Sequence, residues 1–366
     1  MAKLVCSSSH DTFSMNDPIW KSPNGTLLDI DFTSKFDLKK IDSRPKNLWR
    51  YREAIPIAND KNIISVDEGF TPLLKIKFDN KNAWIKQEQL FSSGSYKDRG
   101  ASVLMSKVKE LGINHVVQDS SGNAGCAIAM YGALYGISCD IYVPDNTSES
   151  KLSQIKSYGA TLHKIIGSRE DTAKAAFLAA QECYYASHCW NPFFFQGTKT
   201  FAYEVCEQLG WKAPDTLVLP LGNGTLVIGC YLGFYDLLNA KIISKIPKII
   251  AVQSENCAPL FYEFNGLIKK EKIFESTKTI AEGIAISEPI RGKQILRYIR
   301  DTLGKIITVS EEEIIDSLNS CCKKGYYIEP TSAAAIAGLR KYLKSSENEL
   351  VVSLFSGHGL KSKSSS

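Results

Sequence analysis

The chain has 366 residues, of which 44% are hydrophobic and 23% charged. These proportions exclude a disordered chain, and the length predicts about two folded domains. The 44 basic and 39 acidic side chains leave a net charge of +5, which is too small and too dispersed to predict a nucleic-acid-binding face.

No apolar run approaches the roughly 18 residues of a membrane span, and the first ten residues lack the apolar stretch of a secretory signal. The ten cysteines are scattered and form no CxxC pair, so we expect reduced thiols in a cytoplasmic protein. Cys321 and Cys322 are adjacent. Two neighbouring helix residues are the preferred interpretation, and a redox switch is the alternative.

Short β-branched runs alternate with helical patterns along the chain. Strands are predicted at 83–87, 114–118, 139–143, 161–166, 216–219, 249–252 and 350–354, and helices at 99–111, 124–135, 148–158, 169–183, 200–209 and 332–343. This alternation predicts an α/β fold of two domains, with parallel or mixed twisted sheets flanked by helices. Ligands in such folds bind beyond the carboxyl ends of strands, so the loops after strands are the candidate sites.

The loop at 93–100, Ser-Gly-Ser-Tyr-Lys-Asp-Arg-Gly, opens a helix. The positive end of the helix dipole disfavours a charged Lys97 and favours the neutral amine, which can attack a carbonyl to form a Schiff base. A solvated surface lysine is the alternative interpretation.

Two further loops follow strands and open helices. Small residues at 119–125 and glycines at 219–229 expose backbone N–H groups that can bind a carboxylate or a phosphate. Plain strand–turn–helix connections are the alternative for both. A fourth loop, 354–361, contains His358, which is interpreted as a turn residue in preference to a catalytic base.

The four loops together suit pyridoxal phosphate. The chain resembles the fold-type-II pyridoxal-phosphate-dependent enzymes of the tryptophan synthase β-like superfamily, and among them most closely the threonine synthases. The resemblance covers nearly the whole length, and it includes the motifs at 48–53, 67–73, 196–200 with Glu204, and 329–334.

The resemblance implies a role for each candidate residue. Lys97 is the Schiff-base lysine and, once freed, the general base and acid. Asn123 contacts the ring hydroxyl of the cofactor, and Ser356 its pyridine nitrogen. The substrate α-carboxylate is bound by Ser120, Ser121, Gly122 and Ala124, and the cofactor phosphate by Gly222, Asn223, Gly224, Thr225 and Leu226. Because a hydroxyl does not hold the pyridine nitrogen protonated as a carboxylate would, elimination or replacement chemistry is favoured over transamination.

The resemblance also predicts the domain organisation. Residues 1–32 correspond to a zinc-ribbon-like segment, but only Cys6 remains, so no metal is expected. Residues 33–96 with 200–360 form a large cofactor-binding domain, 97–199 a smaller mobile α/β domain, and 361–366 a disordered tail. The cofactor is expected in the interdomain cleft, and the enzyme is expected to be a homodimer acting on a small amino-acid substrate.

One departure from the family pattern bears on the substrate. Phe193-Phe194-Phe195 follows Asn191-Pro192, and Phe194 stands where threonine synthases have an arginine that grips the substrate phosphate. Three explanations stay open. Another cation, such as Lys199 or Arg291, binds the substrate phosphate in place of the arginine, or the substrate is not a phosphate ester, or the alignment is shifted by a residue or two. The stretch 281–289 is similar to that of threonine dehydratases, in which Glu282 has either a ligand-binding or a loop-capping role.

Three functions therefore compete. The preferred one is threonine synthase, which converts O-phospho-L-homoserine and water into L-threonine and phosphate. The alternative is a serine/threonine dehydratase or another β-elimination or β-replacement enzyme on the same scaffold. A non-catalytic amino-acid or cofactor sensor is the remote third.

Overall fold

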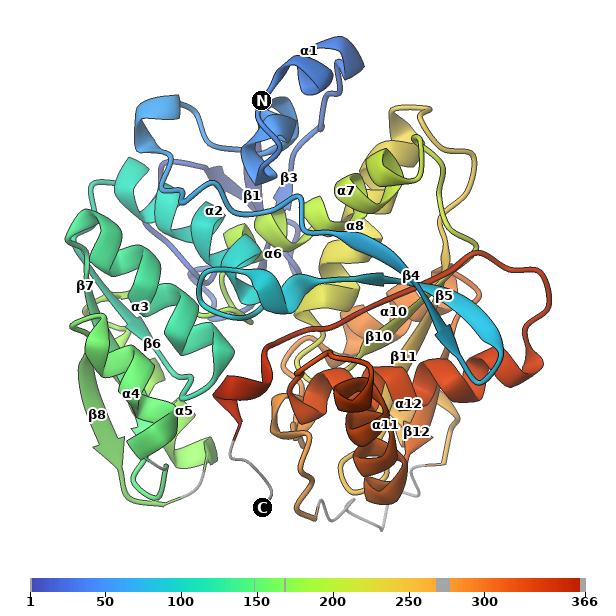
Figure 1. The fold of residues 1–366 in the computed structure, drawn as a ribbon. Coiled ribbons are helices and arrows are strands. Elements are labelled where there is room, and N and C mark those ends of the chain that lie inside the picture. Colours follow the sequence, from blue (N-terminus) through green and yellow to red (C-terminus); the bar gives the residue numbers. More distant parts are fainter. Residues whose placement is uncertain (1, 148, 168, 268–276, 363–366) are drawn as a thin grey trace. The chain divides into compact units, whose positions relative to one another are not determined.

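The computed structural model describes residues 2–147, 149–167, 169–267 and 277–362 (Figure 1). Its contacts divide the chain into two compact units. Unit 1 comprises Met1–Phe70 and Lys97–Thr200, and unit 2 comprises Thr71–Tyr96 and Phe201–Ser366. Residues 363–366 of the expected disordered tail lie outside the described residues.

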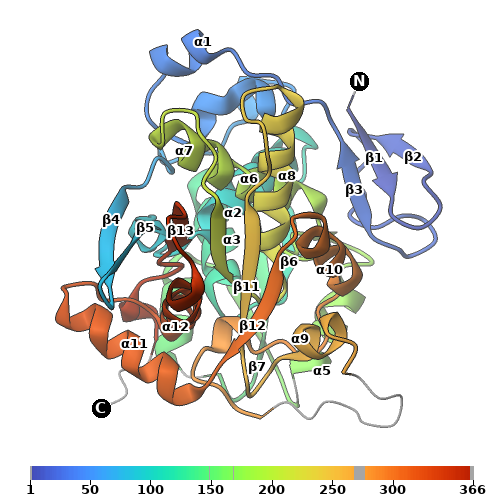
Figure 2. The same cartoon turned by 90° about the vertical axis from the view of Figure 1, so that its right-hand side faces the viewer.

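Unit 1 begins with a small antiparallel sheet of order β2-β1-β3, formed by β1 (Lys3–Cys6), β2 (Thr12–Ser14) and β3 (Leu28–Asp31) (Figure 2). The buried Cys6 thiol lies 3.3 Å from Ser8 Oγ and 3.0 Å from Thr26 Oγ1. Hydrogen bonds from Ser8, Ser9 and Thr26 lower the pKa of this thiol to about 5. No cluster of three or more metal-ligating His, Cys, Asp or Glu side chains is found within the described ranges.

The main sheet of unit 1 is parallel throughout, with strand order β8-β7-β6-β9. Its strands are β6 (His115–Gln118), β7 (Ser138–Pro144), β8 (Thr161–Ile165) and β9 (Tyr184–Tyr185). The α-helices of this unit are α1 (Leu38–Ser43), α2 (Lys97–Glu110), α3 (Asn123–Tyr135), α4 (Glu149–Ser157), α5 (Arg169–Ala179) and α6 (Pro192–Thr198). Apolar side chains from α2, α3 and the strands form one buried cluster.

Residues 33–70 belong to unit 1, whereas the sequence analysis assigned 33–96 to the larger domain. This stretch contains two 3₁₀ segments, Leu48–Ala54 and Asp60–Asn62, and residues within it pack along α2. Trp49 and its apolar neighbours cluster with Val103. Trp49 Nε1 also lies 3.1 Å from Ser102 Oγ, and the Ile64 amide donates to Ser106 Oγ at 2.8 Å. These contacts with α2 explain why residues 33–70 belong to unit 1.

Unit 2 is built on a six-stranded sheet of order β12-β11-β10-β13-β5-β4, in which β4 alone pairs antiparallel with its neighbour. The strands are β4 (Leu73–Phe78), β5 (Lys81–Lys86), β10 (Thr216–Pro220), β11 (Lys248–Ser254), β12 (Lys305–Val309) and β13 (Val351–Leu354). The α-helices are α7 (Thr200–Gln208), α8 (Thr225–Asn239), α9 (Pro259–Phe264), α10 (Gly292–Asp301), α11 (Glu311–Lys323) and α12 (Pro330–Ser345). Short 3₁₀ segments occur at Glu88–Leu90, Glu282–Ile284 and Gly359–Lys361.

The predicted α/β fold is confirmed, and each of the seven predicted strands is present with its ends within two residues of the prediction. The β-branched run 305–309 carried a strand signal that the sequence analysis missed, and β4 and β9 were also missed. Cys321 and Cys322 both lie in α11, as expected for adjacent helix residues. All ten cysteines are free thiols. In the described part of the chain, no helix is long and apolar enough to cross a membrane.

Candidate active site

The loop at 120–124 lies at the carboxyl edge of the unit 1 sheet. It follows β6 and opens α3, and Gly122 at the N-cap position provides no capping side chain for the first amides of the helix. A Cβ at Gly125 would lie 1.8 Å from the Ser120 carbonyl oxygen, so only glycine permits this turn. The uncapped helix start and the partly exposed loop are compatible with an anion, and the carboxylate-binding role of Ser120, Ser121, Gly122 and Ala124 stays a prediction.

Lys97 is the first residue of α2, which begins two residues before the predicted helix start at 99, and its side chain is half-buried. Burial holds the pKa of His188 well below its usual range, and the charges of Lys97 and Arg169 add to this effect. His188 follows β9, which pairs in parallel with β6. The lysine is therefore close enough to this sheet edge for its charge to act on His188.

Asp119, the residue that directly follows β6, lies at the same edge. Desolvation raises its pKa, against the opposing effects of Arg169 and the Tyr185 hydroxyl. The sequence analysis noted Asp119 within its loop but gave neither it nor His188 a role. In unit 1, Asp119 and His188 thus follow the neighbouring parallel strands β6 and β9 at the edge from which the loop at 120–124 also leaves.

In unit 2 the candidate phosphate loop, residues 222–226, follows β10 and opens α8. A Cβ at Gly222 would lie 2.9 Å from the Gly283 carbonyl oxygen, and Gly224 has a φ of +71°. Neither position accepts a larger residue without strain. The N-cap Gly224 has no capping side chain, so the start of α8 can serve as an anion site.

Tyr96, which belongs to unit 2 and directly precedes Lys97, forms hydrogen bonds in this same region. The Tyr96 hydroxyl lies 2.9 Å from Thr225 Oγ1, and the Tyr96 amide donates to the Ser356 carbonyl oxygen at 3.0 Å. Nothing local in the sequence indicates this partner of Tyr96, because the two residues are 129 positions apart.

Ser356 follows β13, which lies beside β10, so Ser356 and the phosphate loop share the carboxyl edge of the unit 2 sheet. Its buried hydroxyl donates to Glu329 Oε1 at 2.8 Å and lies 3.0 Å from Ser332 Oγ. Glu329 and Ser332 belong to the motif at 329–334, which the sequence analysis quoted without assigning individual roles.

Other side chains considered from the sequence have structural partners. His358 Nδ1 accepts a hydrogen bond from the Leu360 amide at 3.1 Å, as expected of a turn residue. Lys199 Nζ lies 3.1 Å from Ser34 Oγ. Arg291 is buried and donates to Gln294 Oε1 at 2.9 Å. Phe194 is fully buried in the unit 1 core, where a Cβ at Gly100 would lie 2.4 Å from its ring.

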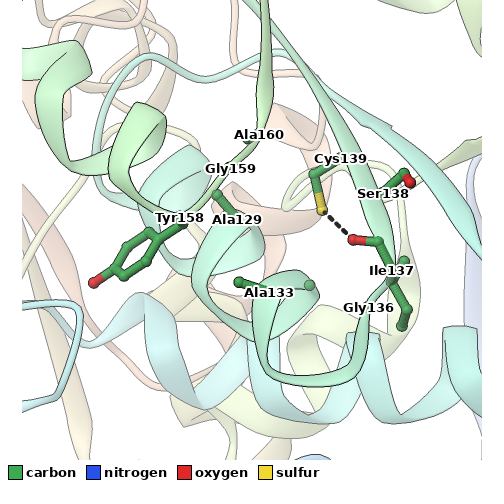
Figure 3. A pocket seen from close by; sticks show the side chains of 10 residues that line it. Ala129, Ala133, Gly136, Ile137, Ser138, Cys139, Tyr158, Gly159 and Ala160 are labelled. Atoms are coloured by element: carbon green, nitrogen blue, oxygen red, sulfur yellow. Dashed lines mark hydrogen bonds between the residues drawn. The ribbon is translucent and has the colours of Figure 1, made fainter.

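A pocket of about 210 Å³ occurs elsewhere in unit 1, lined by residues of α3, the start of β7 and the turn before β8 (Figure 3). The Cys139 thiol lies 3.5 Å from the Ile137 carbonyl oxygen, and burial raises its pKa to about 12. The pocket lies at the amino ends of β7 and β8, whereas the candidate site follows the carboxyl ends of strands.

These residues fit pyridoxal phosphate. Gly222 and Gly224 keep side chains away from the uncapped start of α8, where a phosphate can bind. The hydroxyl of Ser356 is available at the same sheet edge for a ring nitrogen. The buried Ser95 Oγ has no hydrogen-bond partner among the described residues, and Ser95 pairs with Gly357, the residue after Ser356. An unsatisfied buried hydroxyl at such a position is consistent with a polar ligand.

Comparison with known proteins establishes the class. A family model described as "Pyridoxal-phosphate dependent enzyme" matches residues 64–357. The chain belongs to this family of pyridoxal-phosphate-dependent enzymes.

Within the family, the chain is similar to curated threonine synthases. That of Methanocaldococcus jannaschii is 31% identical over 97% of this chain and 92% of its own length, and that of Methanosarcina acetivorans is 32% identical over 99% and 92%. Among solved structures, threonine deaminase isoform 2 from Solanum lycopersicum matches with a TM-score of 0.70 at 20% identity, covering 90% of this chain and 87% of that one. Maize serine racemase matches with a TM-score of 0.67 at 24% identity, covering 80% and 88%. At these identities the structural matches support the fold alone.

Proposed function

We propose that this chain is a threonine synthase, which converts O-phospho-L-homoserine and water into L-threonine and phosphate. The observation that carries the proposal is the similarity to threonine synthases over 97% of the chain, combined with an intact lysine at the start of α2 and an intact phosphate loop. Bound pyridoxal phosphate would supply the electron sink for carbanion chemistry.

In this proposal the candidate residues have the following roles. Lys97 attaches the cofactor and, once released, moves the substrate α-proton, because its amine can both accept and return a proton. Asn123 contacts the ring hydroxyl, and the loop at 120–124 binds the substrate carboxylate. The phosphate loop, residues 222–226, binds the cofactor phosphate at the start of α8, and Ser356 contacts the pyridine nitrogen.

A second candidate function is serine or threonine dehydration, or another β-elimination or β-replacement. The observation that favours it is Phe194, which is 0% exposed and packs into the unit 1 core at the position assigned to a phosphate-gripping arginine. An aromatic ring provides no charge-assisted hydrogen bonds for a substrate phosphate. Of the alternative cations, Lys199 contacts Ser34 and Arg291 contacts Gln294.

One assay separates the two candidates. The purified enzyme is supplied with O-phospho-L-homoserine, L-serine or L-threonine, and phosphate, threonine and 2-oxo acid are measured in parallel. Stoichiometric phosphate and threonine from phosphohomoserine support the synthase. Formation of 2-oxo acid from serine or threonine, without turnover of phosphohomoserine, would support the dehydratase in place of the synthase.

Cofactor attachment is tested separately by spectroscopy. The native protein should show a visible absorbance band that hydroxylamine removes, and Lys97→Ala should lack it. Lys97→Arg serves as the matched variant, since it keeps the positive charge but cannot form the bond. A band that persists in either variant would contradict the assignment of Lys97.

We also propose that the enzyme is a cytoplasmic homodimer. The free state of all ten cysteines supports a reducing compartment, and the dimer rests on the resemblance to the family. Light scattering during size-exclusion chromatography measures the mass directly, and a single species of monomer mass would contradict the dimer.

A further inference from the structure

An exposed arginine in unit 1 lies at the carboxyl edge of the parallel sheet. Arg169 is the first residue of α5, which follows β8. The strands of this sheet are parallel and have the order β8-β7-β6-β9. The chain after β8 therefore leaves the sheet at the same edge as the loop at 120–124, which follows β6. Ligands of α/β folds bind beyond this edge.

Two residues at this edge respond to the charge of Arg169. Burial lowers the pKa of His188, and the charges of Lys97 and Arg169 lower it further. Desolvation raises the pKa of Asp119, and the charge of Arg169 is the largest effect that opposes this rise. Because such Coulomb effects weaken with distance, the guanidinium group lies near the ends of β6 and β9, which these two residues follow.

His188 also connects Arg169 with the position at which the sequence analysis expected a phosphate-binding cation. Phe194 occupies that position, and its ring centroid lies 6.0 Å from that of His188 in an edge-to-face arrangement. The alternative cations Lys199 and Arg291 are each 2% exposed. Arg169 is exposed at the sheet edge, so it can reach a ligand that those two buried side chains cannot.

The guanidinium group of Arg169 has no hydrogen bond or ion pair with another side chain in the described part of the chain. The nearby acidic side chain of Asp171 is directed to other neighbours. A Cβ at Gly167 would lie 2.6 Å from Asp171 Oδ2, and Lys174 Nζ lies 3.9 Å from Asp171 Oδ1. A guanidinium group in this state can form two parallel hydrogen bonds to a phosphate group.

We propose that Arg169 binds the phosphate group of the substrate and supplies the cation that is absent at Phe194. This inference rests on the proposed function, and it names the residue that selects a phosphate ester over serine or threonine. O-phospho-L-homoserine has a carboxylate at one end and a phosphate at the other, so it needs two anion sites. The loop at 120–124 and Arg169 provide them at one edge of the sheet, and proton transfer belongs to Lys97.

The test measures the affinity of the full-length holoenzyme for O-phospho-L-homoserine, as KM, and for inorganic phosphate, by isothermal titration calorimetry. In Arg169→Gln both the KM and the Kd of phosphate should rise by about ten- to a hundredfold, because charge-assisted hydrogen bonds are lost. Arg169→Lys keeps the charge without the paired geometry and should lose less affinity. The affinity for L-2-aminobutyrate, which has the α-carboxylate but no phosphate, should stay the same.

Lys174→Gln is the matched control, because it removes one exposed positive charge from the same helix. Both constants should remain unchanged in this variant, and an equal rise in Lys174→Gln would reduce the effect to net charge and overturn the site. If Arg169 serves only as a counter-charge for Asp119, Arg169→Gln would melt at a lower temperature with an unchanged Kd of phosphate. That result, or an equal loss of affinity for L-2-aminobutyrate, would also overturn the proposal.

Failure of the proposed function gives a different result. If phosphohomoserine is converted to threonine and Arg169→Gln keeps both constants, the synthase stands and the role of Arg169 is wrong. If the holoenzyme converts no phosphohomoserine but binds inorganic phosphate through Arg169, the anion site stands and the synthase is wrong. A holoenzyme that neither converts phosphohomoserine nor binds phosphate would overturn both.

Discussion

The buried ion pair in unit 2 between Lys86 and Glu204 leads to a sharp stability prediction. Lys86 Nζ lies 2.8 Å from Glu204 Oε2, and both side chains are 0% exposed. The ammonium also donates to the Thr71 carbonyl oxygen at 2.5 Å and to Gln208 Oε1 at 2.9 Å. Of these three acceptors, Glu204 is the carboxylate.

Glu204→Gln keeps the shape of the side chain and removes its charge. Lys86 would then lose the carboxylate that its buried ammonium contacts, and removing one partner of a buried ion pair costs about 3–5 kcal/mol. For a unit of this size, each kcal/mol lowers the melting temperature by about 2–4 °C. The melting temperature of unit 2, followed by circular dichroism, should therefore fall by about 6–20 °C.

The double variant Lys86→Met with Glu204→Leu provides the control. It replaces both charges with apolar side chains of similar length, so no charge stays buried alone, and much of the loss should be recovered. The reasoning fails if Glu204→Gln melts within about 2 °C of the unsubstituted protein, or if the double variant is less stable than the single one.

Three further predictions concern other parts of the molecule. Hydrogen bonds from Arg44 lower the pKa of Glu53 to about 2 from its usual 4.5, so their contribution to stability is complete above pH 4.5 and is lost as the pH falls to 2. Glu53→Gln should therefore cost about 1 kcal/mol at pH 7 in urea unfolding, since the pair is partly exposed, and nothing near pH 2; a cost independent of pH would contradict this. Gly100→Ala should destabilise unit 1 by about 1 kcal/mol or more despite the better helix propensity of alanine, because its Cβ would lie 2.4 Å from Phe194; the further change Phe194→Leu should relieve the loss, and purely additive effects would argue against the contact. Tyr96→Phe removes the hydrogen bond to the phosphate loop and should weaken cofactor affinity by about five- to tenfold in a fluorescence titration, whereas an unchanged Kd would show that the hydroxyl has no part in binding.

Local patterns in the sequence were sufficient to predict the α/β fold and the places of the candidate residues at strand ends and helix starts. Continuous apolar runs predict buried parallel strands, and a small or glycine-rich loop between such a run and a helix predicts an anion site, because both signals depend on residues close together in the chain. Lys97 at the first position of α2, the loop at 120–124 before α3 and the loop at 222–226 before α8 were all located in this way.

Contacts between distant residues were decided only by the tertiary structure. The packing of Trp49 on α2, the pair of Lys86 with Glu204, and the hydrogen bond from Ser356 to Glu329 each join residues separated by 27 or more positions. No periodicity or turn motif specifies such a partner, because the contact depends on which side chains the folded sheet and helices bring within reach. The sequence therefore determined which residues surround the candidate site, and the fold determined that a carboxyl group lies behind the hydroxyl at Ser356.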